Sequence, residues 1–495
     1  MSDTPTDSNR ASEPTGSQYW RSLDDLAQTP GFRNWVEREF PEGASELDGP
    51  GRRGFMKVMA ASFGFAGLGF SGCRRPEQAI VPYGRQPEEV IPGVPSYYST
   101  SVPGPFGNEP VVVESHQARP TKIEGNPSYK PYGGSTGVHA QASVLDLYDP
   151  DRATETQTRV ARNSSNWNAL SKSKRDALLA ECASTISEAS SNAKVAFLAS
   201  KSSSPSRSKI AAALGKKQNV IWAEREAIDA SGPEIALAEH FKSEQPIRAV
   251  HHLDKAKRVF SLDSDFLGAE PDQLRNTKAF SKGRSVSSNK KAPEKMNRLY
   301  SVEANLTLTG SMADHRLRLN ASQITAFAHL LTAEILSQTN SAPASMVKSM
   351  RAAGKDLEIT PKWVSEAAKD LVANAGRSVV LAGSHLPAEA HILTYSMNQA
   401  LKAIGKTVHY VKVDTSTASS ENDLVSELEK GSINTLIFVG GNPGYDSSRD
   451  WNTLLKGVSK VIRFGYSLDE TSQLADVHVA STHYLESWSD GVSCS

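Results

Sequence analysis

Short apolar runs alternate with longer segments of helical apolar spacing from about residue 165 onward. The apolar runs, each typical of a buried strand, are residues 194–199, 219–222, 258–262, 378–382, 408–413, 435–439 and 461–464. The segments with helical spacing are residues 167–190, 210–214, 324–336, 363–375 and 388–404. Because strands that alternate with helices form right-handed βαβ units, this pattern predicts an α/β fold with mostly parallel sheets flanked by helices.

A different pattern precedes this alternation. Two β-rich runs, residues 110–114 and 120–124, are separated by a short turn, and Gly125-Asn126-Pro127 ends the second run. We therefore expect a hairpin within a small β-rich N-terminal subdomain. Residues 76–107 are rich in Pro, Gly and Tyr, which predicts an extended linker with little regular structure.

Composition excludes some classes of function. Lys plus Arg and Asp plus Glu are 55 each, so no net charge favours binding to nucleic acid. The cysteines are Cys73, Cys182 and Cys494, which are too far apart for a CxxC metal motif. An iron–sulfur cluster usually needs about four thiolates. This chain therefore cannot hold a cluster with cysteine alone.

A basic motif near the front predicts export. Arg52 and Arg53 are followed by Phe55 and Lys57, and then by an uncharged apolar run at residues 58–72. This arrangement is typical of a twin-arginine export signal, although a basic turn before a buried helix has the same pattern. The apolar run is shorter than the roughly 20 residues that cross a bilayer.

Cys73 follows the apolar run in the sequence Phe70-Ser71-Gly72-Cys73, which is close to a lipoprotein box. Phe70 stands where Leu is usual, so Cys73 is either a lipidation site or a free thiol. One acyl chain would give only marginal binding to a membrane.

These patterns predict the domain organisation. Residues 1–50 are a polar extension, 51–75 the export signal, 76–107 the linker and 108–160 the β-rich subdomain. Residues 161–370 are expected to form an α/β domain, and 371–495 a second, Rossmann-like α/β domain that ends early.

Several separated segments resemble the molybdopterin oxidoreductase superfamily. They are residues 124–127 with 147–152, 260–267, 303–316, 377–383, 436–443 and 469–477. The long polar lead before the arginine pair resembles the variant twin-arginine signals of molybdopterin oxidoreductase-like subunits of alternative complex III. The sequence around residues 483–490 resembles a point well inside the family domain, so the resemblance implies a truncated or split product that lacks the cluster-binding half.

The resemblance implies that this chain lacks the family's iron–sulfur ligands. In catalytic members a cysteine ligand and a lysine lie between the two segments that match residues 124–127 and 147–152. Here those positions are taken by His139 and Gln141. No cysteine occurs at residues 74–181. His139 is a candidate metal ligand, but a single imidazole without neighbouring ligands is more often structural.

The strongest family segment contains Gly440, Gly441 and Asn442, directly after an apolar run. Bare backbone at the carboxyl edge of a parallel sheet lets a phosphate or nucleotide approach, so these residues are candidates for cofactor binding. A Gly-Gly turn is also a common way for a chain to leave a sheet. His315 beside Asp314 similarly suggests either proton chemistry or a hydrogen-bonded structural pair.

These inferences lead to an expected function. The resemblance implies an exported, periplasmic, membrane-associated subunit of a quinol-oxidising respiratory complex, structural and without a pterin or cluster in this segment. Its expected partners are quinol-binding membrane subunits and cytochrome c subunits. The alternatives are a catalytic molybdopterin-dependent oxidoreductase of the polysulfide-reductase type, and a fragment that does not fold stably.

Overall fold

The computed structural model describes residues 29–31, 84–85, 88, 90–104, 107–162, 164, 166–191, 193–285, 296–358, 361–413 and 418–493. The chain divides into two compact units, Met1–Gln86 and Pro87–Ser495, and the elements below belong to the second. The expected export signal and Cys73 lie outside the described residues. No helix within the described ranges is both long and apolar enough to cross a membrane.

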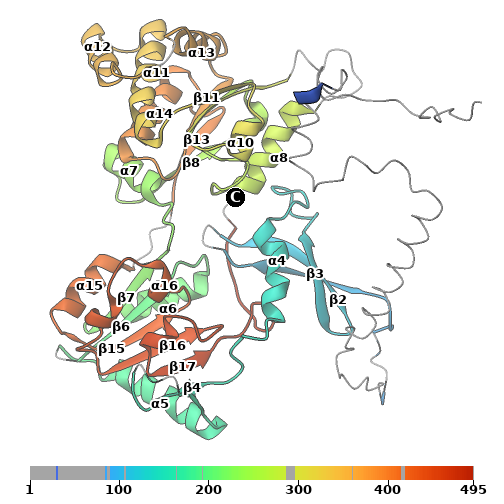
Figure 1. Cartoon of the computed structure of the whole chain (residues 1–495), viewed down its shortest axis with the longest axis vertical. Coiled ribbons are helices and arrows are strands. Elements are labelled where there is room, and N and C mark those ends of the chain that lie inside the picture. The colour runs from blue at the N-terminus through green and yellow to red at the C-terminus, as the bar shows by residue number, and fades with distance from the viewer. Residues whose placement is uncertain are drawn as a thin grey trace, which may run out of the picture. The chain divides into compact units, whose positions relative to one another are not determined.

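The expected β-rich subdomain is an antiparallel sheet with one helix (Figure 1). Its strands pair in the order β1 (Ser96–Val102), β2 (Glu109–His116) and β3 (Arg119–Gly125), and α4 (Val138–Leu147) packs on β3. Val111, Val113 and Ile123 form its core. The predicted hairpin is confirmed, but β1 lies in the stretch expected to be an irregular linker. Its residues become a strand because all seven pair with β2, which lies outside that stretch.

An eight-stranded sheet forms the first lobe, which comprises residues 157–225 and 419–480. Its strand order is β14-β7-β6-β15-β16-β17-β4-β5, and the strands from β14 to β17 are parallel. The strands are β4 (Gln157–Thr158), β5 (Asn168–Ala169), β6 (Lys194–Ser200), β7 (Val220–Arg225), β14 (Ser419–Ser420), β15 (Ile433–Val439), β16 (Lys460–Gly465) and β17 (Val477–Ala480).

Helices flank both faces of this sheet, as Figure 1 shows. Val195 and Phe197 of β6 pack toward α5 and α6, whereas Ala196 and Leu198 pack toward α15 and α17. This alternation follows from the two-residue period of a strand and gives the sheet two apolar faces. The helices are α5 (Lys172–Ser187), α6 (Pro205–Gly215), α15 (Glu421–Glu429), α16 (Pro443–Asp446) and α17 (Trp451–Leu454), with the 3₁₀ turn η4 (Ser472–Leu474).

The second lobe comprises residues 232–412 and is inserted between β7 and β14. Its parallel sheet has the order β11-β10-β9-β12, and β8 and β13 form a separate antiparallel pair. The strands are β8 (Ile247–His251), β9 (Arg258–Leu262), β10 (Arg298–Glu303), β11 (His315–Arg318), β12 (Ser378–Ala382) and β13 (Val408–Lys412). The helical elements are α7 (Gly232–Phe241), η2 (Leu253–Lys255), α8 (Gln273–Arg284), α10 (Leu308–Ser311), η3 (Ala321–Gln323), α11 (Ile324–Thr339), α12 (Ala344–Ala353), α13 (Pro361–Ala373) and α14 (Ala388–Ala400).

The two expected α/β ranges, 161–370 and 371–495, each contribute strands to both large sheets. The sheets therefore do not follow that boundary. β15 pairs with β6, more than two hundred residues earlier, and β12 pairs with β9. The physical reason is that a strand joins the sheet where its neighbours bury both of its faces, and position along the chain does not set that choice.

Candidate functional site

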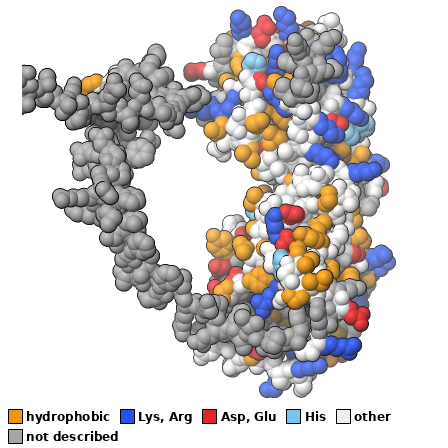
Figure 2. All heavy atoms as spheres, turned by 90° about the vertical axis from the view of Figure 1, so that its right-hand side faces the viewer, with side chains coloured by type: hydrophobic (Ala, Val, Ile, Leu, Met, Phe, Trp, Pro, Cys, Tyr) orange, Lys and Arg blue, Asp and Glu red, His pale blue; other side chains and the backbone are white. Residues whose placement is uncertain are grey.

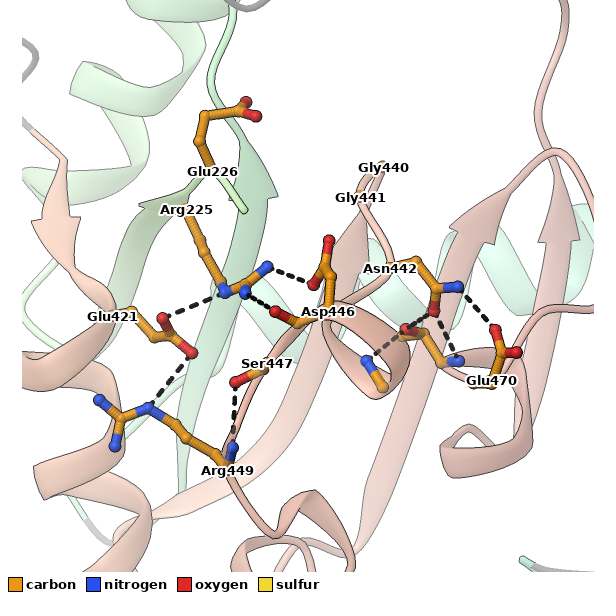
Figure 3. Close-up of polar contacts among 12 residues, drawn as sticks. Arg225, Glu226, Glu421, Gly440, Gly441, Asn442, Asp446, Ser447, Arg449 and Glu470 are labelled. Atoms are coloured by element: carbon orange, nitrogen blue, oxygen red, sulfur yellow. Dashed lines mark hydrogen bonds and ion pairs between the residues drawn. The ribbon is translucent and has the colours of Figure 1, made fainter. Parts of the chain in front are cut away.

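Three segments meet at one edge of the eight-stranded sheet, where its parallel strands end. Figure 3 shows two of them, at Arg225 and at Gly440-Gly441. Arg225 ends β7, Gly440 and Gly441 follow β15, and Ser200 ends β6. In open α/β sheets ligands bind outside the carboxyl ends of the strands. This edge is therefore the candidate functional site.

The Gly440-Gly441 turn has a backbone that other residues rarely adopt. The φ angles are +68° and +62°, and a Cβ added to Gly440 would lie 2.7 Å from Ser200 Oγ. Arg463 lies beneath the turn, with Nη1 donating to the Gly440 carbonyl at 2.7 Å and Nη2 donating to that of Gly441. The same Nη2 contacts Asp469 Oδ2 at 2.6 Å. The turn is thus held by the side chain of Arg463, which is almost fully buried.

Asn442 is also engaged by its own chain. Its Oδ1 accepts hydrogen bonds from the Thr471 N–H at 3.1 Å and the Thr471 hydroxyl at 2.6 Å. Its Nδ2 donates to Glu470 Oε2 at 2.7 Å. The Gly444 N–H in turn donates to Thr471 Oγ1 at 2.9 Å. Figure 3 shows these contacts fixing the start of α16 against the loop that carries Glu470.

Arg225 joins two acidic residues at the same edge. Its Nε donates to Glu421 Oε2 at 3.1 Å, and its Nη1 and Nη2 donate to Asp446 Oδ1 at 2.6 Å and to the Asp446 carbonyl at 2.9 Å. Arg449 Nε lies 3.3 Å from Glu421 Oε1. The guanidinium of Arg225 is therefore surrounded by internal acceptors (Figure 3).

Glu226, next along the chain, has a different environment. Its Oε1 accepts from the Lys201 N–H at 2.7 Å, and burial raises the pKa of its carboxyl. Nearby, Arg207 donates to the Ser200 carbonyl at 2.7 Å and lies over the Trp222 ring. Burial lowers the pKa of Arg207, whereas Glu224 and Glu226 oppose that effect.

The other residues singled out from the sequence lie elsewhere. His139 is exposed in the first turn of α4, and Cys182 is half-buried in α5, where burial raises the pKa of its thiol. Asp314 contacts Arg284 and accepts from the Leu299 N–H at 2.7 Å, while the ring of His315 stacks on Tyr300. Nowhere in the described residues do three or more His, Cys, Asp or Glu side chains gather as metal ligands would.

Sequence reasoning found the glycine turn and Asn442 but missed Arg225, Arg463 and Glu226. Arg225 and Glu226 come three and four residues after the predicted strand 219–222, and Arg463 lies within the predicted strand 461–464. That position at the end of a parallel strand was the available signal. What the sequence did not contain was the pairing of β6 with β15, which brings these residues to one edge.

Comparison with known proteins supports the fold. No family model matches the chain, and no curated protein matches it. A solved structure, acetylene hydratase from Pelobacter acetylenicus, aligns with a TM-score of 0.56 at 10% sequence identity. The alignment covers 78% of this chain and 63% of that enzyme, so this chain spans less than two thirds of the enzyme's length. The chain has a molybdopterin-oxidoreductase-like fold. At this identity the likeness concerns the fold alone.

Proposed function

We propose that this chain is a non-catalytic, molybdopterin-oxidoreductase-like subunit of an exported respiratory complex of the alternative complex III type. The observation that carries the proposal is that Arg225 and Arg463, two cations at the candidate site, are engaged by acceptors of this chain. Both guanidinium groups donate to carboxylates and carbonyls of this chain.

A pterin dinucleotide would bring a diphosphate to this edge, and the residues present do not fit one. Such an anion needs cationic side chains or N–H groups that are free to donate. Asp446, Asp469 and Glu470 instead place carboxylates beside the turn and around the two arginines. These carboxylates would repel the negative charges of a diphosphate bound at the same edge. We therefore assign no step of catalysis to a pterin in this chain.

The cysteine count supports the same role. The whole sequence holds three cysteines, and Cys182 lies in α5, away from the position where the family's ligands would be expected. Electron transfer through the complex would then use clusters in a different segment or subunit. The proposed role of this chain is to provide a folded surface that positions the segment or subunit that carries the clusters.

An apolar surface is available for such docking. α4 exposes Val138, at 79%, and Leu145, at 68%, two turns apart on one helix face, and Tyr148 follows. Figure 2 shows apolar side chains gathered on part of the face turned to the viewer. Contiguous exposed apolar surface commonly marks a protein–protein interface. The proposed partners are the quinol-binding membrane subunits and cytochrome c subunits of the complex.

The decisive experiment is metal and cofactor analysis of the full-length chain, purified from a host that makes molybdopterin. We expect molybdenum, tungsten and iron far below one equivalent, with a cooperative unfolding transition that excludes a misfolded sample. A parallel purification from native membranes should retain haem-containing and membrane-embedded subunits. Stoichiometric molybdenum or tungsten would overturn the non-catalytic role, and isolation from native membranes as a free monomer would overturn the subunit role.

A further inference from the structure

A cavity of about 120 Å³ lies in the second lobe, away from the carboxyl edge of the eight-stranded sheet. The segments at the carboxyl ends of β9 and β12 line one side of the cavity, and α7 and β8 line the opposite side. Because β10 and β12 pair with opposite sides of β9, the cavity lies at the point where the order of strands reverses. Ligands of parallel sheets bind at such points.

The charged residues at this cavity leave one carboxylate without a cation. Arg248 pairs with Glu234, and Arg275 pairs with Asp272 at 2.5 Å. Glu270 accepts from the Ser384 N–H at 3.1 Å and 3.2 Å, and no ion pair forms at its carboxylate within the described part of the chain. The nearby imidazole of His385 contacts Asp263 at 3.1 Å. Burial raises the pKa of Glu270, while the hydrogen bonds from Ser384 and the nearby His385 oppose that rise.

Two uncharged side chains at the cavity, His391 and Asn276, offer acceptors. His391 Nε2 lies 3.2 Å from the Leu386 carbonyl, so that nitrogen carries the proton and Nδ1 is left as an acceptor. Burial lowers the pKa of His391 to about 4 and that of His251 to about 3, so both rings are neutral near pH 7. Asn276 is 4% exposed, and no hydrogen bond to its Oδ1 forms among the described residues.

Two aromatic rings, those of Phe266 and Tyr410, also line the cavity. Aromatic faces attract cations, and a desolvated organic cation gains more from them than a hydrated ion does. A phosphate would instead meet Glu270 and Asp272, which precede the first turn of α8. The charge at this helix start therefore opposes an anion and favours a cation.

We propose that this cavity binds a small organic cation with N–H donors, such as a primary amine or a guanidinium compound, whose charge is neutralised by Glu270. The carboxylate accepts from the ligand's N–H groups, and the aromatic rings cover its apolar part. This site is independent of the proposed role as a respiratory subunit, because none of its residues lies at the edge of the eight-stranded sheet.

The test is calorimetric titration of the full-length protein with methylguanidine, with AMP as an anionic comparison and sodium chloride as an ionic-strength control. Wild-type protein is expected to bind methylguanidine saturably and to bind AMP less tightly. Glu270→Gln keeps the shape of the side chain and an oxygen for the Ser384 N–H. We expect this change to weaken binding about tenfold or more, because it removes a charge-assisted contact.

Glu239→Gln, an exposed change on α7, is the matched control and should bind as wild type does. Thr394 also lines the cavity, and its buried Oγ1 has no hydrogen-bond partner among the described residues. Thr394→Val removes this acceptor with little change in shape, so it should weaken binding without altering the unfolding transition. Three outcomes would overturn the proposal: no saturable binding of methylguanidine at millimolar concentration, equal binding by the folded Glu270→Gln variant, or tighter binding of AMP.

Discussion

Arg225 at the end of β7 and Asp446 in α16 are 221 residues apart in sequence, and their side chains meet with Nη1 and Oδ1 2.6 Å apart. The second lobe is inserted between the segments that carry them. The ion pair thus joins the two parts of the first lobe across the insertion. Arg225 also contacts Glu421, so its removal leaves the carboxylate of Asp446 without its cation and that of Glu421 with Arg449 alone.

Replacing Arg225 by Met should therefore destabilise the first lobe by about 2 kcal/mol, the usual range for hydrogen bonds to charged groups. Urea unfolding followed by circular dichroism measures the change. Arg175→Met is the control, because the Arg175–Asp176 pair is exposed at 43% and 56% and should contribute close to nothing. Equal stabilities for the two variants would contradict the structural importance of Arg225.

Substitutions at two glycines, Gly440 and Gly431, can distinguish the cost of a left-handed backbone from the cost of a steric clash. Gly440 and Gly431 have φ angles of +68° and +67°, but only at Gly440 would an added Cβ meet another atom, Ser200 Oγ. Gly431→Ala should cost about 1 kcal/mol for the left-handed backbone alone. Gly440→Ala should cost measurably more, and adding Ser200→Ala should bring its cost down to that of Gly431→Ala. A double-mutant cycle without coupling between positions 440 and 200 would argue against this packing.

Stability should decrease on acidification because of His478. Burial, assisted by Arg463, lowers its pKa from 6.5 to about 4, so between these values the unfolded chain binds a proton that the folded chain does not. The stabilisation is complete above about pH 6.5 and is lost as the pH falls toward 4, with a slope on the order of 1 kcal/mol per pH unit. His478→Gln should reduce the slope by about this amount in unfolding curves measured from pH 7 to pH 4, and the depressed pKa values of His391 and His251 account for the slope that stays. His139→Gln, an exposed change in α4, should leave it as in wild type.

The export signal is tested by a paired substitution. Arg52→Lys with Arg53→Lys should abolish accumulation outside the cytoplasm, because twin-arginine receptors read the arginine pair as an address. The control is Arg74→Lys with Arg75→Lys, which makes the same change to a second arginine pair on the other side of the apolar run. Cell fractionation followed by immunoblotting measures the result. Equal export of both variants would point to a different route.

Charged substitutions test whether the apolar face of α4 binds the partner subunits. Val138→Glu with Leu145→Glu places two carboxylates on the exposed helix face and should remove the copurifying subunits without changing the unfolding transition, since neither side chain contributes to the buried core. Ile235→Glu, at an apolar side chain of α7 that is 49% exposed, is the matched control. Retention of the partners by the α4 variant would place the interface elsewhere.

Local elements followed closely from the residues. The apolar runs at 258–262 and 378–382 are β9 and β12 with the same bounds, and the helix expected at 388–404 is α14, Ala388–Ala400. These predictions succeed because the period of apolar residues reflects local geometry, which neighbouring residues determine. The strand expected at 408–413 is β13, Val408–Lys412, which pairs antiparallel with β8 and so lies outside the parallel sheets.

The sequence by itself determined the alternation of strands and helices, a turn at Gly440-Gly441 and the shortage of thiolates for an iron–sulfur cluster. Only the tertiary structure decided which strands share a sheet, and hence that Arg225, Asp446 and Arg463 meet around that turn. The reason is physical: hydrophobic burial identifies a strand from its own residues, but the choice of partner depends on which distant faces become buried together.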